Sequence, residues 1–395
     1  MARNDSIAGP VPLRRERLSE TVPRRAATTA EWQPLSALGA VATEWRDLVG
    51  RAIEPNVFYD PAFALAAAPV FGRNAGAVLV RQQGRLIGLF PLRSERRYGL
   101  LSALVGWTHP YAPLGIPLVD RDAAEAAIEA FLGEIGTDGP RVLLLPMLTR
   151  EGAFAAALTR VLARRGGMAS GFGDHARALL APSGERAGYL EHTLAHKKLK
   201  ELRRQRRRLA DSGAIELVTA RTPADVAAAL GDFLALEAAG WKGGAGSAVA
   251  AHAPIRAFME GALTGLAADG HARITRLLHA GRPLAAAITL RSGATSWFWK
   301  IAYDESHARA SPGVQITLDL TGELLADASI ARVDSCAIAD HPMIDHLWGE
   351  RLALSDLLIA PNADALTSFR LACRLEAMRR AAFATAKRVR NALRR

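Results

Sequence analysis

The stretch HARITRLLHAGRPLAAAITLRSGATSWFWKIAY, residues 271–303, decides the fold. Turn residues interrupt it at 280–283 and again at 292–294, and the segments between these breaks are rich in apolar residues. In the two later segments apolar side chains recur with a period of two, which is typical of strands. The expected faces are Leu284, Ala286, Ile288 and Leu290, and then Trp297, Trp299, Ile301 and Tyr303. The pattern predicts three adjacent strands in an antiparallel meander.

A buried helix is expected directly after the meander. Ser311 suits an N-cap, and Pro312 suits the first turn of a helix. Two apolar stripes between residues 314 and 325 predict that most of the helix circumference is buried. Free amide groups and the helix dipole favour an anion at this end, where Gly313 lets an oxygen atom approach the backbone. The same three residues also suit a helix cap that binds no ligand.

Two segments resemble a known family. Residues 299–313 (WKIAYDESHARASPG) and residues 233–243 (FLALEAAGWKG) are similar to the CelD-like acetyltransferases associated with cellulose biosynthesis. These proteins belong to the GNAT superfamily, and the Fem-type peptidyl transferases are related to them by fold. The resemblance implies an α/β (α+β) fold of two tandem GNAT-like domains, with mixed sheets flanked by helices. It also implies acetyl-CoA or another acyl-CoA as the cosubstrate.

The resemblance assigns roles in binding acyl-CoA. A backbone amide of the third strand would polarise the thioester carbonyl, and the loop and helix after it would hold the diphosphate. The residues implied are Lys300, Ile301, Ala302, Ser311, Gly313, Val314 and Gln315. This sequence differs from the common GNAT loop because Pro312 has no N–H group to donate.

A shorter match suggests that the chain contains two copies of one fold. Residues 84–94 and residues 281–292 both begin with Gly-Arg and end with Leu-Arg-Ser, and their glycines are 197 residues apart. The first copy continues into an aromatic and proline-rich loop at residues 106–115, with no capped helix directly behind it. We therefore expect the first copy to lack the cosubstrate and to form a wall of the acceptor cleft.

These features divide the chain into five expected parts. They are a disordered basic tail at 1–28, a degenerate GNAT-like domain at 29–188, a basic linking helix at 189–211, a GNAT acyltransferase domain at 212–360 and a basic helical tail at 361–395.

The net charge of +11 is unevenly distributed. Residues 1–25 carry +3, residues 196–208 carry +7 and residues 370–395 carry +8, which leaves −7 for the remainder. A run of charge is usually a solvated helix face. The run between Lys197 and Arg208 is also suited to an anionic partner, such as CoA phosphates, an acidic carrier protein, RNA or a lipid surface.

Acyl transfer needs a base for the attacking amine or hydroxyl and benefits from an acid for the departing thiolate. The candidate bases are Glu237, Asp334, Asp340 and His341, and the candidate acid is Tyr303. The candidate acceptor contacts are Trp107, His109, Tyr111, Trp241 and Lys242. For each of these residues a purely structural role is the alternative interpretation.

Other classes of protein are not indicated by the sequence. It has no apolar run of about 20 residues and no secretory signal, so we expect a cytoplasmic protein without a membrane span. Cys336 and Cys373 match neither a disulfide framework nor a zinc motif, and no metal site is expected. His192 and His196 have ligand spacing on an expected helix, but no third ligand is evident.

Three functions remain open at this stage. The first is transfer of an acyl group from acyl-CoA to an amine or hydroxyl of a small-molecule, saccharide or envelope-precursor acceptor, as in polysaccharide biosynthesis. The second keeps the fold but takes its acyl group from aminoacyl-tRNA or an acyl-carrier protein. The third is a non-catalytic scaffold protein of an exopolysaccharide pathway.

Overall fold

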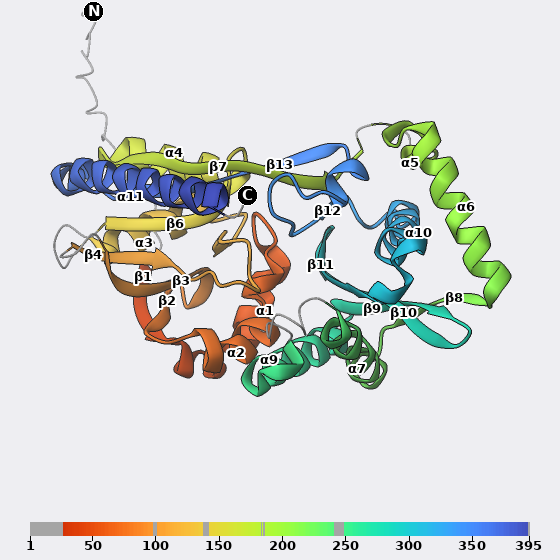
Figure 1. Cartoon of the computed structure of the whole chain (residues 1–395). Coiled ribbons are helices and arrows are strands. Elements are labelled where there is room, and N and C mark those ends of the chain that lie inside the picture. The colour runs from red at the N-terminus through yellow and green to blue at the C-terminus, as the bar shows by residue number, and fades with distance from the viewer. Residues whose placement is uncertain are drawn as a thin grey trace, which may run out of the picture.

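A computed structural model describes residues 27–97, 101–136, 142–182, 184, 186–240 and 249–393 of the chain (Figure 1). These residues form one mixed sheet of 13 strands, in the order β1-β2-β3-β4-β6-β13-β7-β12-β11-β10-β9-β8, with β5 paired to β3. The expected α/β fold class is confirmed, and the two halves of the chain share one continuous sheet. The expected disordered tail lies outside the described residues except for its last two positions, because β1 already begins at Thr28.

The N-terminal half runs as far as residue 188. Its elements are β1 (Thr28–Pro34), η1 (Leu35–Val41), α1 (Ala42–Arg51), η2 (Val57–Tyr59), α2 (Pro61–Phe71), β2 (Ala75–Gln82), β3 (Arg85–Arg97), β4 (Leu101–Gly106), β5 (Leu118–Val119), α3 (Ala124–Ile135), β6 (Val142–Thr149), α4 (Ala153–Arg165) and β7 (Met168–Leu180).

The C-terminal half begins with two helices. Its elements are α5 (Tyr189–Thr193), α6 (His196–Ser212), β8 (Ile215–Ala220), α7 (Pro223–Ala239), η3 (Val249–Ala251), α9 (Ala253–Ala268), β9 (Ala272–His279), β10 (Arg282–Ser292), β11 (Thr295–Tyr303), η4 (Glu305–Ala310), α10 (Pro312–Ala326), β12 (Arg332–Asp334), η5 (Ile344–His346), β13 (Glu350–Ala360), η6 (Ala363–Ala365) and α11 (Leu366–Leu393).

The two halves repeat one strand pattern in detail. The turn between β2 and β3 has positive φ at two successive residues, and so does the turn between β9 and β10, 197 positions later. One residue is bulged just after each turn, Ile87 in β3 and Leu284 in β10, and these also lie 197 positions apart. In each half a fifth strand then joins the meander in parallel, β6 beside β4 and β12 beside β11. The short sequence match therefore reflects a real structural repeat.

The halves are joined through strand exchange. β13 comes from the C-terminal half of the sequence but lies between β6 and β7 of the N-terminal half. β7 is a strand of 13 residues that pairs with β13 along most of its length and with β12 at its end. Because β7 reaches across the junction in this way, the two sheets continue into each other (Figure 1).

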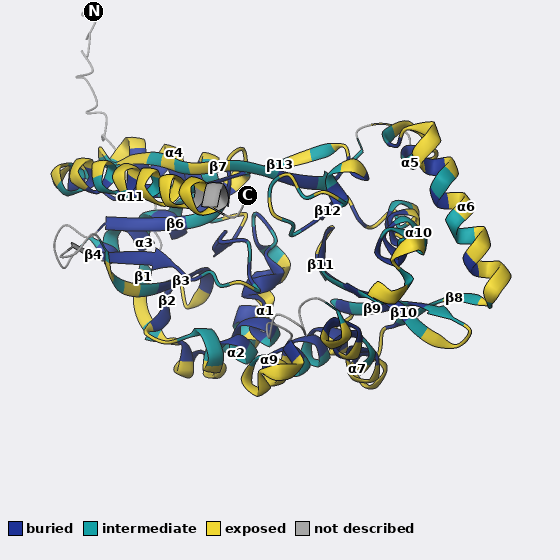
Figure 2. Cartoon of the chain, viewed as in Figure 1, coloured by how far each residue is buried: buried dark blue, intermediate teal, exposed yellow. Residues whose placement is uncertain are grey.

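Helices cover both faces of the C-terminal half of the sheet. On one face α2, α7 and α9 enclose a core that includes Phe63, Phe258 and Trp299. On the other face α10 packs against the sheet and α6 packs against α10, with Leu199, Leu209 and other apolar residues buried between them. The outward sides of α6 and α11 are exposed (Figure 2).

The bulges alter both expected strand faces. In β10, Leu284 contacts the core beneath α10, whereas Ala286, Ile288 and Leu290 contact the core beneath α7 and α9. Lys300 pairs with Ile288 and Phe298 pairs with Thr289, so Trp299 is an extra residue in β11. Trp297 and Trp299 contact the core beneath α7 and α9, as expected, but Ile301 and Tyr303 contact the core beneath α10. The prediction that all four share one face is therefore wrong beyond the bulge, because an unbroken period of two cannot continue through it.

The expected basic linking helix is divided. Leu194 has extended backbone angles, so α5 ends at Thr193 and α6 begins at His196. His192 and His196 consequently lie on different helices, which removes the ligand spacing that a single helix would give them. No helix in the described part of the chain is long and apolar enough to cross a bilayer.

Candidate functional site

The central feature of the site is a fork between β11 and β12. The two strands pair only at residues 295–297 of β11, and β12 ends at Asp334. Beyond this point, residues 298–303 pair with β10 on one side, and no described strand pairs with their other edge. No described strand takes up the backbone amide groups on that edge, which makes it a candidate place for a ligand to pair with β11.

The bulge at Trp299 brings the side chain of Lys300 to the N-terminal half. The Lys300 ammonium lies 4.2 Å from the centroid of the Tyr111 ring, a cation–π contact between the halves. The Trp299 indole N–H donates to the carbonyl of Tyr111 at 2.8 Å. The loop that follows β4 thus contributes Tyr111 to the edge of the fork.

Glu237 stands at the end of α7 beside the same strand. Its side chain is buried, and one carboxylate oxygen accepts a hydrogen bond from the Val249 amide at 2.9 Å. A small cavity of about 40 Å³ is bordered by Leu236, Glu237, Gly240, Ile301, Ala302, Tyr303 and Glu305. Burial raises the pKa of Tyr111, and the negative charge of Glu237 adds to that rise. The structure therefore brings a carboxylate, a phenol and the free strand edge together.

A buried ion pair anchors the closed end of the fork. Arg177 of β7 donates one N–H to Asp334 at 2.5 Å and another to the carbonyl of Pro113 at 2.8 Å. Asp334 also accepts from the amide of Cys336. Both members of the pair are almost completely buried. Asp334 is therefore the buried counter-ion of Arg177, and its role as a base stays a prediction.

The amino end of α10 differs from the expected open end. Ser311 has left-handed backbone angles, and its carbonyl accepts from the amides of both Val314 and Gln315, at 2.9 and 3.0 Å. Gly313 is buried against Tyr303, and a Cβ at this position would lie 2.8 Å from the ring. Packing against Tyr303 is thus sufficient to explain why a glycine occupies position 313. The sequence alone had suggested that Gly313 admits a phosphate oxygen.

Two grooves are lined by residues of both α6 and α10. The first, of about 650 Å³, borders the start of α10 and is mainly apolar. We call it the donor groove, and it is lined by Thr193, Leu194, Ala195, Lys198, Val314, Pro342, Met343, His346 and Leu347.

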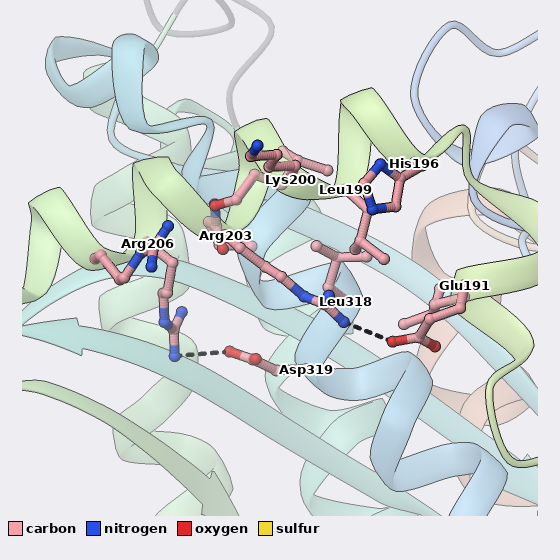
Figure 3. A pocket seen from close by; sticks show the side chains of 12 residues that line it. Glu191, His196, Leu199, Lys200, Arg203, Arg206, Leu318 and Asp319 are labelled. Carbon is pink, nitrogen blue, oxygen red and sulfur yellow. Dashed lines mark hydrogen bonds and ion pairs between the residues drawn. The ribbon is translucent and has the colours of Figure 1, made fainter.

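The second groove, of about 600 Å³, lies between α5, α6 and the middle of α10 (Figure 3). We call it the α6 pocket. Its charged residues are Glu191, Lys200, Arg203, Arg206, Arg207 and Asp319. Arg203 points to Glu191, with 2.6 Å between nitrogen and oxygen, and Arg206 points to Asp319 at 3.1 Å. Burial raises the pKa of Asp319, while Arg206 opposes that rise.

The comparisons with known proteins agree with this geometry. The family described as "Acetyltransferase (GNAT) domain" matches residues 196–341, a segment that runs from the start of α6 to the loop after β12. Residues 196–341 are a GNAT acetyltransferase domain. None of the curated proteins compared with the chain matches it.

Solved structures share the fold of nearly the whole chain. FemX is 11% identical, with a TM-score of 0.55, and the match covers 84% of this chain and 98% of FemX. The C-terminal DUF2156 domain of an Agrobacterium fabrum protein assigned as a lysylphosphatidylglycerol synthetase is 12% identical, with a TM-score of 0.52. That match covers 86% of this chain and 97% of the domain. With the GNAT domain and this fold, the chain is a GNAT-type acyltransferase.

The remaining predicted bases do not line the cavity beside Ala302. Asp340 is exposed and has left-handed backbone angles. The His341 imidazole accepts a hydrogen bond from the amide of Met343 at 3.3 Å, so it shapes the loop that lines the donor groove. Among the predicted acid–base residues, Glu237 and Tyr303 are the two that border the cavity beside Ala302.

The predicted acceptor contacts have different surroundings. Trp107 is 1% exposed and donates to the carbonyl of Phe71, so it packs in the core, and its role as an acceptor contact stays a prediction. His109 stacks on Phe71 with the ring centroids 4.3 Å apart. Burial, followed by the charges of Arg93 and Lys300, lowers the pKa of His109 to about 3. Trp241 and Lys242 lie outside the described residues.

Sequence reasoning missed several parts of the site. The α6 pocket was not foreseen, because nothing in a run of cations tells which of them face a neighbouring helix. Arg177 carried no motif that could have marked it as the partner of Asp334. Both cysteines are free, and the described residues contain no group of three or more His, Cys, Asp or Glu placed to hold a metal ion.

Proposed function

We propose that the protein transfers an acetyl or longer acyl group from acyl-CoA to an amine or hydroxyl of a small-molecule, saccharide or envelope-precursor acceptor. The observation that carries the proposal is the edge of β11 at residues 300–302, with which no described strand pairs, inside a GNAT domain. Backbone amides there are fixed by β10 and can donate to a thioester carbonyl oxygen as it gains negative charge.

The donor groove fits the extended arm of acyl-CoA. It begins beside Val314, at the amino end of α10, and its apolar lining suits a pantetheine chain. Lys198 supplies one cation at this groove for a phosphate. The small cavity beside Ala302 favours a short acyl group such as acetyl. Bound acyl-CoA supplies the activated thioester, and the protein contributes position and charge.

Glu237 is the general base that we propose. It borders the free edge of β11, and the hydrogen bond from Val249 holds one carboxylate oxygen in place. The acceptor enters from the side of Tyr111 and Lys300, where the N-terminal half forms a wall. We propose Tyr303 as the acid that protonates the thiolate, since this residue borders the same cavity.

Binding and turnover test the proposal separately. Calorimetry with CoA and acetyl-CoA should detect binding to the full chain, and release of free thiol from acetyl-CoA should report transfer to a panel of amines, sugars and lysate components. Glu237→Gln should bind acetyl-CoA as the unchanged protein does but lose transfer. The proposal fails if neither thioester nor CoA binds, and the role of Glu237 fails if the variant turns over normally.

A different donor is the second candidate, and the outer face of α6 favours it. Several of its cations are exposed and do not line the α6 pocket, including Lys197, Arg204 and Arg208. Aminoacyl-tRNA or an acyl-carrier protein would then replace CoA, and the affinity for that donor should fall steeply with salt.

The CelD-like resemblance, a cytoplasmic location and a role in polysaccharide synthesis are further proposals. A scaffold protein without activity is the outcome if partners bind tightly and no thioester turns over.

A further inference from the structure

The amino end of α10 has few hydrogen-bond donors left for a phosphate. A helix normally leaves its first four N–H groups without a partner inside the helix. Here Pro312 has no N–H, the amide of Ser311 donates to Ala308, and the amide of Val314 donates to Ser311. Gly313 alone remains among these four, and the Tyr303 ring covers its α-carbon. If the protein binds phosphate groups tightly, side chains must therefore supply most of the hydrogen bonds and positive charge.

The α6 pocket has the side chains for that task. Four cations line it against two carboxylates, and His196 stands at its rim. Arg203 and Arg206 each use part of a guanidinium for an ion pair, so further N–H groups remain on both. The second terminal nitrogen of Arg206 is buried and has no hydrogen-bond partner. A buried guanidinium nitrogen without a partner costs free energy that an anion in the pocket would recover.

The pocket also has the shape for a small molecule. Its volume of about 600 Å³ is within the usual range for ligand sites. Leu190, Leu199 and Leu318 give it an apolar floor, on which a nucleobase or another flat group can lie. An RNA backbone would instead be expected to follow the cations of α6 that do not line the pocket, such as Arg204 and Arg208.

We propose that the α6 pocket binds a phosphate-bearing small molecule of nucleotide size through Arg203, Arg206 and Arg207. The ligand would link α6 to α10, which are already joined by a hydrogen bond from the Gln315 side-chain amide to the carbonyl of Leu202. This inference rests on the proposed function in one respect only: α10, which lines the α6 pocket, also borders the donor groove of the proposed acyltransferase. The phosphate belongs either to the acyl donor or to a separate phosphorylated metabolite.

The test compares two double variants that remove equal charge from α6. Arg203→Ala with Arg207→Ala empties the pocket of two cations, whereas Arg204→Ala with Arg208→Ala removes two exposed cations that do not line it. Calorimetry with pyrophosphate and with adenosine 3′,5′-bisphosphate should give a dissociation constant about ten- to hundredfold higher for the pocket variant. The control variant should bind within about twofold of the unchanged protein.

Two outcomes support the site and separate the sources of the phosphate. Loss of CoA binding together with pyrophosphate binding assigns the pocket to the donor. Loss of pyrophosphate binding with CoA binding intact assigns it to a separate ligand, and leaves the proposed acyl-CoA function standing. The inference is overturned if neither probe binds the unchanged protein, if both variants weaken binding equally, or if RNA binds and only the control variant weakens it.

Discussion

The Arg177–Asp334 pair should contribute strongly to stability, because it joins the two halves at the closed end of the fork. Replacing Arg177 with Met leaves the Asp334 carboxylate buried without its counter-ion and the carbonyl of Pro113 without its donor. Losing one member of a buried pair costs about 3–5 kcal/mol. The lost bond to Pro113 adds about 1 kcal/mol. We therefore expect Arg177→Met to lower the free energy of unfolding by about 4–6 kcal/mol.

A double-mutant cycle separates the pair from its surroundings. Asp334→Asn removes the charge but can still accept the hydrogen bond from the amide of Cys336. In urea denaturation the double variant should lose about 2–3 kcal/mol less than the sum of the single losses. As a control, Arg332→Met on the same strand should cost about 1 kcal/mol or less, since this arginine makes one long hydrogen bond to Thr295. Additive losses at Arg177 and Asp334 would refute the reasoning.

Four further predictions concern single sites. Glu237→Gln should lower kcat about 10²- to 10⁴-fold without changing the unfolding midpoint, and an unchanged kcat in a thiol-release assay would exclude it as the base. Gly313→Ala should lower the free energy of unfolding by about 1–3 kcal/mol, because the added Cβ meets the Tyr303 ring. In a protein that also carries Tyr303→Ala, the same change at Gly313 should cost little, and denaturation measures both. His109 is held neutral with a pKa of about 3, so only the unfolded chain gains its proton as the pH falls from 6.5 towards 3. Stability should therefore fall by about 2 kcal/mol at pH 5, and His109→Gln should flatten that part of the pH profile. Tyr111→Phe should retain acceptor KM, whereas Tyr111→Ala should raise it, and equal effects of the two would argue against a ring contact with Lys300.

The local signals in the sequence were sufficient for the meander and the repeat. The turns at Gly84 and Gly281 adopt positive φ, which glycine permits, and both β-hairpins form around them. The expected helix after Ser311 begins at Pro312, as its N1 preference predicts. These features depend on short-range backbone chemistry, which a single sequence records directly.

The pairing of strands that are far apart in the sequence could not be predicted in the same way. The apolar content of residues 350–360 did not reveal that β13 would enter the other half, because strand exchange depends on which edges are free when the halves meet. The bulges at Leu284 and Trp299 are set by pairing register, and each moves the following side chains to the opposite face. The contact between Tyr111 and Lys300 follows from both effects.

The most direct test of the account is a structure of the protein with a non-hydrolysable thioether analogue of acetyl-CoA. We predict that its carbonyl oxygen lies about 2.7–3.1 Å from a backbone amide among residues 300–302. We also predict that its pantetheine arm occupies the donor groove beside Val314. An analogue bound away from the fork, or a fork closed by protein side chains with the analogue present, would contradict the central claim.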